Sequence, residues 1–287
     1  RLYLYQAYCW HGLILQDFLL YYRYAQKWVD LFHAEPHMSR VEAPYFIKGL
    51  HNLLMAHFML RNYSKFDETL RQFEAFAASE GAVINANIQA QTFVYLSIAR
   101  INGYFLKGDF SEGLHLVPHI EEKLSEYQLL IDRHRTLVLY YKIACLYFGA
   151  GDVNNTIEYL NRIIHWKVDL RTDLQCYARM LHLIAHYELG NFDILEHLIK
   201  SLYRFMAQME SLGTVEKEIF RFLRKAFQLN SEVRIRAAFA ILKEKLEKHE
   251  HDPFESRSFM YLDIISWLES KIEGISIQEV ISKKAPG

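Results

Sequence analysis

The sequence predicts an all-α protein, a right-handed α-α superhelix (solenoid) of about six antiparallel helix pairs with a C-terminal capping helix. The 287-residue chain contains only 12 Gly and 5 Pro, which is too few for a β protein with many tight turns. A short motif, in which a small residue precedes Asp or Asn and then an apolar residue, recurs between long stretches of helical periodicity. A recurring turn between helices is typical of a helical repeat array.

The turn motif repeats at intervals of about 40 residues. KGDF, AGDV and LGNF begin at Lys107, Ala150 and Leu189. The Gly of each can adopt the left-handed conformation that ends a helix, and the following Asp or Asn can accept N–H bonds at the start of the next helix. Successive Asp or Asn residues are 45, 47, 43, 39 and 39 positions apart. They are Asp17, Asn62, Asp109, Asp152, Asn191 and Asn230.

Each turn separates two periodic stretches, and together these predict the helices in order. The expected pairs are 2–15 with 18–33, 44–60 with 64–78, 84–107 with 110–127, 134–149 with 153–165, 171–189 with 192–211, and 214–228 with 231–249.

A terminal helix at 254–271 and a short helix at 276–283 complete the array. We interpret 1–287 as a single domain because no low-complexity linker interrupts it. Its repeat units are roughly 1–35, 43–80, 83–128, 133–168, 170–212 and 214–250.

The two helices of a pair differ in character. Residues 136–149 are apolar on every side apart from Lys142, so this first helix should be interior. Residues 153–166 are apolar on one face only, so this second helix should be outer and amphipathic. At the third turn, Asp109 and Glu112 fit a capping box. Further along that outer helix, Pro118 should introduce a kink.

Composition excludes several classes of function. The residues are 51% hydrophobic and 23% charged, as in well-packed soluble proteins. A net charge of −1 without a basic tail predicts no nucleic-acid partner. No run of eighteen apolar residues is free of charge, so no membrane span is expected. Three widely spaced cysteines in apolar helical stretches favour a reducing, cytoplasmic setting.

No motif predicts an enzyme, a cofactor or a metal site. The sequence lacks G-x-S-x-G, a P-loop and G-x-G-x-x-G. Three histidine pairs have the i, i+4 spacing of zinc ligands, but none has the Glu of H-E-x-x-H and proline interrupts two of them. Buried or surface histidines are therefore the prediction. The pairs are His33 with His37, His115 with His119, and His182 with His186.

Residues 140–163 resemble the tetratricopeptide repeat. The pattern W-x2-L-G-x2-Y followed by A-x3-F is matched by Tyr140-x2-Ile143-Ala144-x2-Tyr147, the turn Gly151-Asp152 and Thr156-x3-Leu160. The period of 39–47 is longer than the 34 residues of that family, and the closing Pro is absent.

The resemblance implies that first helices line a concave groove that binds a protein or peptide. We therefore expect a non-enzymatic interaction module or scaffold. Residues at these positions could instead pack on one another, and the alternative function is the ligand-sensing half of a bacterial regulator whose effector domain is absent. Carried over by position, the groove residues are His51, Met55, Phe58, Tyr95, Asn102, Phe105, Tyr141, Phe148, Tyr177 and Tyr187.

The two ends of the array differ. The last helix carries Asp263, Glu269 and Lys271 and resembles the polar cap that a repeat stack needs. The first residues, 2–8, are rich in Leu and Tyr and do not resemble such a cap. The sequence therefore predicts that an N-terminal element or a second subunit, as in a homo-oligomer, covers the N-terminal end.

Overall fold

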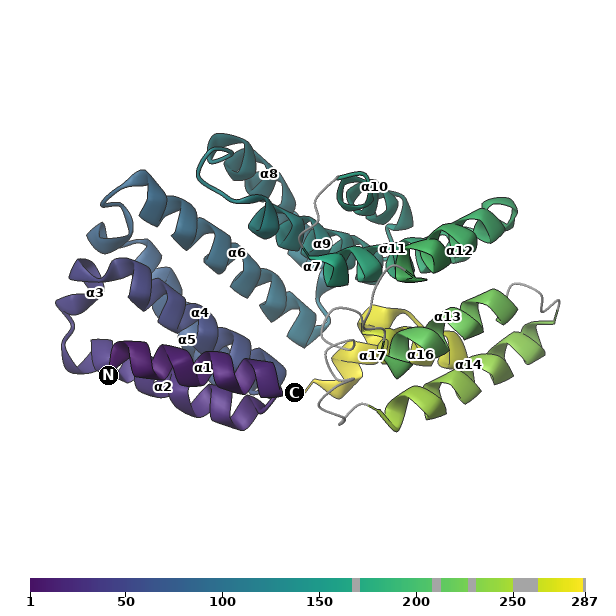
Figure 1. Ribbon diagram of the computed structural model, residues 1–287, viewed down its shortest axis with the longest axis horizontal. Coiled ribbons are helices and arrows are strands. Elements are labelled where there is room, and N and C mark those ends of the chain that lie inside the picture. Colours follow the sequence, from purple (N-terminus) through teal and green to yellow (C-terminus); the bar gives the residue numbers. More distant parts are fainter. Residues whose placement is uncertain (167–170, 208–212, 227–230, 250–262, 286–287) are drawn as a thin grey trace. The chain divides into compact units, whose positions relative to one another are not determined.

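The computed structural model describes residues 1–166, 171–207, 213–226, 231–249 and 263–285, and within these every regular element is a helix (Figure 1). The pairs predicted from the turns are α1 and α2, α4 and α5, α6 and α8, α9 and α10, α11 and α12, and α13 and α14. The bounds are α1 Leu2–Leu15, α2 Phe18–Ala34, α3 Met38–Val41, α4 Ala43–Met59, α5 Tyr63–Ala77, α6 Ala86–Lys107, α7 Phe110–Gly113, α8 Val117–Glu126, α9 Arg133–Gly149, α10 Val153–Ile164, α11 Thr172–Glu188, α12 Phe192–Ala207, α13 Thr214–Ala226, α14 Glu232–Glu247, α16 Ile264–Glu273 and α17 Ile277–Lys284.

The turns between paired helices, which we call elbows, share one backbone conformation, which the sequence predicted for the three elbows that contain Gly. The residue before the Asp or Asn is left-handed at five elbows, with φ between 50° and 84°. At four of them the Asp or Asn N–H bonds the carbonyl five residues back at 2.8–3.0 Å, which is the Schellman arrangement. The sixth predicted elbow, at Asn230, lies outside the described residues. The left-handed residues are Gln16, Arg61, Gly108, Gly151 and Gly190.

Side-chain capping follows the prediction at some elbows and not at others. The carboxylate of Asp17 accepts from the N–H of Leu20 at 2.9 Å, and Asp152 acts likewise at the start of α10. The capping box predicted at Asp109 is wrong, because the Asp109 side chain makes no capping hydrogen bond. A capping box is present instead where Ser276 and Glu279 begin α17.

Pro118 has a larger effect than the predicted kink. The expected helix 110–127 is broken into α7, a 3-10 turn at Leu114–Leu116 and α8. Pro118 lies in the first turn of α8, where its missing N–H would have no intrahelical partner in any case. Proline therefore starts a new helix here, and the predicted continuous outer helix is wrong.

Other boundaries differ by a few residues. The short helix α3 and a 3-10 turn at Glu80–Ala82 were not expected from the sequence. The last long helix was expected to begin at 254, but residues 254–262 lie outside the described residues and α16 begins at Ile264. Among the described residues no helix is both long and apolar enough to cross a lipid bilayer.

The chain divides into two compact units. Unit 1 comprises residues 1–107 and 115–139, and unit 2 comprises residues 108–114 and 140–287. In unit 1, α2 packs on α1 and α4, while α4 also packs on α5 and α6. Trp28, Phe66 and Phe73 are among its fully buried side chains. Gly49 lets α2 and α4 approach closely, because a Cβ there would lie 3.0 Å from the Trp28 ring.

Unit 2 is held by packing of α11 on α10 and α12, and of α14 and α17 on α16. Segment 108–114 belongs to this unit. The Phe110 ring lies so close to Gly149 that a side chain there would collide with it, and a Cβ on Gly108 would lie 2.8 Å from the Ser282 hydroxyl of α17. The oxygen Oε1 of Gln278 accepts from the Ser111 N–H at 3.2 Å, so α17 supplies the cap that Asp109 does not.

First helices are mostly buried and second helices are buried on one face, with one exception. The inner helices α6 and α11 bury residues on most sides, whereas α10 buries one face that includes Leu160 and Ile163. The exception is α1, a first helix in which Cys9 and Gly12 alone are buried. The prediction of an interior first helix is therefore wrong for α1 in the isolated chain.

Candidate interaction surfaces

The predicted groove residues of unit 1 meet where α4 packs on α6. The rings of His51 and Tyr95 stack with centroids 4.2 Å apart and an interplanar angle of 12°. The guanidinium of Arg135 lies 5.6 Å from the centre of the Tyr95 ring and donates to its hydroxyl at 3.3 Å. Stacking of this kind holds aromatic side chains in one orientation, so the three side chains form an ordered, half-buried cluster.

A second contact between the same two helices involves a buried amide. Asn102 is 1% exposed, and its Nδ2 donates to the sulfur of Met55 at 3.3 Å. Phe58 on α4 and Phe105 on α6 are half-buried. The predicted groove positions on α4 and α6 therefore lie near one another. Asn102, however, packs between the two helices and does not face solvent.

The predicted residues of unit 2 are more deeply covered. Tyr141, Phe148 and Tyr177 are 3%, 9% and 6% exposed. The hydroxyl of Tyr177 donates to the Glu216 carboxylate at 2.8 Å. Tyr187 is half-buried, and its ring lies 6.3 Å from that of Phe239.

Burial divides the ten predicted positions into two sets. For Asn102, Tyr141, Phe148 and Tyr177 it favours the alternative that these residues pack within the fold. The remaining six, which a partner could reach, are His51, Met55, Phe58, Tyr95, Phe105 and Tyr187.

Helix α1 carries a larger exposed apolar surface. Tyr3, Trp10 and Ile14 are 70%, 59% and 80% exposed. An exposed patch of large apolar side chains indicates a binding surface. The sequence signal was the richness in Leu and Tyr of residues 2–8, but which side of the helix stays uncovered follows only from its packing on α2.

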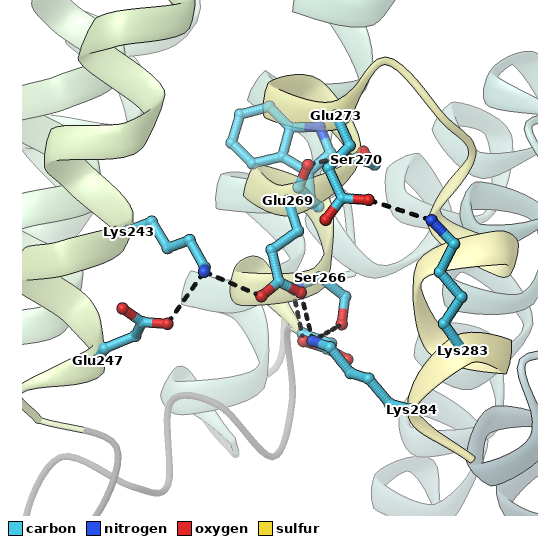
Figure 2. Close-up of polar contacts among 10 residues, drawn as sticks. Lys243, Glu247, Ser266, Glu269, Ser270, Glu273, Lys283 and Lys284 are labelled. Atoms are coloured by element: carbon cyan, nitrogen blue, oxygen red, sulfur yellow. Dashed lines mark hydrogen bonds and ion pairs between the residues drawn. The ribbon is translucent and has the colours of Figure 1, made fainter. Parts of the chain in front are cut away.

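The C-terminal helices are joined by a network of ion pairs. Figure 2 shows Glu269 of α16 between Lys243 of α14, at 3.1 Å, and Lys284 of α17. Burial alone would raise the pKa of Glu269, but the hydrogen bonds and the positive charges of the two lysines together outweigh it and lower the pKa. On the same helix Trp267 donates to Glu188 of α11 at 2.8 Å.

The polar end cap predicted for the last long helix is therefore wrong. Helix α16 buries Ile264, Trp267 and Leu268, and both α14 and α17 pack on it. Glu269 faces partners rather than bulk water, since its side chain is 16% exposed. The partner of Lys271 is Glu188. Sequence patterning missed this network because its members are far apart along the chain.

The histidine pairs do not form a metal centre in the part of the chain that the structure describes, where no group of three or more His, Cys, Asp or Glu residues is suitably arranged. His182 and His186 share α11 with ring centroids 4.5 Å apart, and burial, helped by neighbouring charges, lowers the pKa of His182 to about 4. Burial raises the pKa of the Cys9 and Cys145 thiols to about 12, which disfavours nucleophilic thiolates.

No protein-family model, curated protein or solved structure matches this chain. The fold and its surfaces define the protein as an all-helical chain of tightly packed helix pairs with a recurring elbow, consistent with a helical repeat.

Proposed function

We propose that the chain is a tetratricopeptide-like superhelical array that acts as a non-enzymatic binding module for a protein or peptide. The elbows support a repeat architecture, because five of them place a left-handed residue at the same point of each pair. Packing of α4 on α2, α5 and α6 is the neighbour pattern expected when helix pairs stack.

The observation that most directly supports binding is the stacked cluster of His51 and Tyr95 with Arg135. It combines aromatic surface, hydrogen-bonding groups and partial exposure, a composition typical of recognition surfaces. A half-buried, preordered aromatic pair binds with little loss of side-chain entropy. Unit 1 therefore provides the proposed peptide-contacting residues, together with Met55 and Phe58 on α4.

A random peptide library displayed on phage and panned against the full chain tests the proposal. We expect enriched peptides whose affinity, measured by fluorescence anisotropy, falls about tenfold or more in a His51→Ala, Tyr95→Ala double variant. Tyr203→Ala is the matched control, because Tyr203 is 59% exposed on α12, which belongs to unit 2. Circular dichroism must show that both variants remain helical.

Two results would contradict the proposal. Failure to enrich any peptide would remove its basis, as would affinities that the double variant leaves unchanged. If no peptide binds but a metabolite screen raises the thermal midpoint of the chain, the sensor half of a regulator becomes the better interpretation.

A further inference from the structure

Helix α1 presents an apolar face that stays exposed in the part of the chain that the structure describes. Cys9 and Gly12 are buried, and a Cβ on Gly12 would lie 2.8 Å from the backbone nitrogen of Tyr21 in α2. The rest of the α1 surface holds large exposed side chains, although the rings of Tyr3 and Tyr8 also touch Tyr45 and Tyr24 of the same chain. Its exposed large apolar residues are Tyr3, Leu4, Tyr8, Trp10, Leu13, Ile14 and Leu15.

The exposed residues have the spacing of a helix that packs on another helix. Tyr3, Ala7, Trp10 and Ile14 are all exposed and follow one another at intervals of four, three and four. This alternation is the heptad spacing that keeps a seam facing a partner helix. A second seam on the adjacent side of α1 has the same intervals and consists of Leu4, Tyr8, His11 and Leu15.

We propose that a second copy of this chain covers α1, through an antiparallel two-fold pairing of α1 with α1 of the partner subunit. A two-fold interface requires that residue i faces residue j while residue j faces residue i. The first seam meets this condition, because positions 3 and 14 and positions 7 and 10 are both symmetric about the point between 8 and 9.

Size complementarity favours the antiparallel arrangement. Trp10 would pack against the small Ala7 of the partner subunit, and Tyr3 would pack against Ile14 of the partner subunit. Facing positions that combine large and small side chains fill space without voids. A parallel pairing would oppose two Trp10 rings and leave two Ala7 methyl groups facing one another.

Charge also permits self-association. The segment from Leu2 to Leu15 contains no Asp, Glu, Lys or Arg, so two copies can approach without like-charge repulsion. Antiparallel helices bring the positive end of each helix dipole near the negative end of the other, which is favourable. A charged partner would find no ion-pair partner in this segment, whereas the identical apolar seam of a second copy can pack against it.

The apolar area that α1 exposes is comparable with one side of a standard interface. If each large side chain of α1 spans about 200 Å², its exposed fractions amount to roughly 800 Å² of uncovered surface. A standard interface buries about 800 Å² on each partner. On the same reckoning Tyr3, Trp10 and Ile14 of the first seam supply about half of this area, so side chains beside the seam must supply the rest.

Sedimentation equilibrium of the full chain from about 1 to 100 μM tests the pairing. We expect a concentration-dependent dimer, and we expect Ala7→Glu and Trp10→Lys each to weaken it about tenfold or more. Mixing the two variants in equal amounts should restore the dimer, because the introduced lysine of one subunit faces the introduced glutamate of the other only when the helices are antiparallel. Val233→Glu is the control, since Val233 is 79% exposed on α14.

Each outcome decides the proposal. A folded wild-type chain that stays monomeric at about 100 μM overturns it and assigns the face to another occupant, such as a further helix or a different protein. A dimer that both variants retain lies elsewhere on the molecule, and failure of the mixture to recover refutes the antiparallel register. The assay is independent of the proposed peptide-contacting residues on α4 and α6, so failure of one proposal leaves the other standing.

Discussion

Acid should destabilise unit 1 through a buried histidine. His57 on α4 is 1% exposed, and its ring lies 5.3 Å from that of Tyr22. Burial, together with the positive charge of Lys65 and against the opposing charge of Glu68, lowers its pKa from 6.5 to about 4. The folded protein therefore keeps this imidazole neutral at a pH where the unfolded chain takes up a proton.

The size of the effect follows from proton linkage. Because the folded pKa is the lower of the two, the stability is full above pH 6.5 and declines as the pH falls from 6.5 toward 4. At about pH 5 the unfolded state is protonated and the folded state is mostly not, so protonation of the unfolded chain at this one site costs about 2 kcal/mol of unfolding free energy. The loss approaches about 3 kcal/mol near pH 4.

Urea unfolding at about pH 7.5 and pH 5 measures this loss. His57→Gln cannot take up the proton, so its unfolding free energy should fall between these two values by about 2 kcal/mol less than that of the wild type. His197→Gln removes an exposed histidine on α12 and should follow the wild type. If wild type and His57→Gln lose equal stability on acidification, His57 is not the acid-sensitive group and the argument from burial fails.

Three further substitutions test the packing and the caps. Gly12→Ala should lower the unfolding free energy by about 2 kcal/mol, because its Cβ would lie 2.8 Å from the nitrogen of Tyr21; an unchanged urea midpoint would show that α1 can move away from α2. Gln278→Ala should lower the unfolding free energy by about 1 kcal/mol and speed hydrogen exchange of the Ser111 amide. Equal exchange rates in the wild type and the variant would contradict capping by α17. Asp152→Ala should lower the unfolding free energy by about 1 kcal/mol, whereas Asp152→Ser should retain most of the stability in urea unfolding. Similar losses in the two variants would exclude a capping role for Asp152.

The elbows were predictable because they depend on neighbouring residues. Gly108, Gly151 and Gly190 adopt the left-handed conformation expected of glycine after a helix. At the first two elbows Gln16 and Arg61 adopt it without glycine, and there only the spacing of the following Asp or Asn indicated the turn. The repeat period therefore located these two elbows, which the residue types alone did not indicate.

The exposure of the proposed peptide-contacting residues was less predictable. His51 on α4 stacks on Tyr95 of α6, but helical spacing did not distinguish the half-buried Tyr95 from the buried Tyr141. Both are aromatic residues on first helices. The difference in exposure comes from what covers each one, which depends on helices elsewhere in the chain.

By itself the sequence determined the helical class and the five elbows that the structure describes, because periodicity and capping act within a few residues. Tertiary structure alone decided which groups meet: Gln278 caps Ser111 across 167 residues, Lys243 and Lys284 enclose Glu269, and α1 keeps an apolar face exposed. Such contacts join residues far apart in the chain, and the free energy of burial is set by the surroundings of a side chain rather than by its neighbours in sequence.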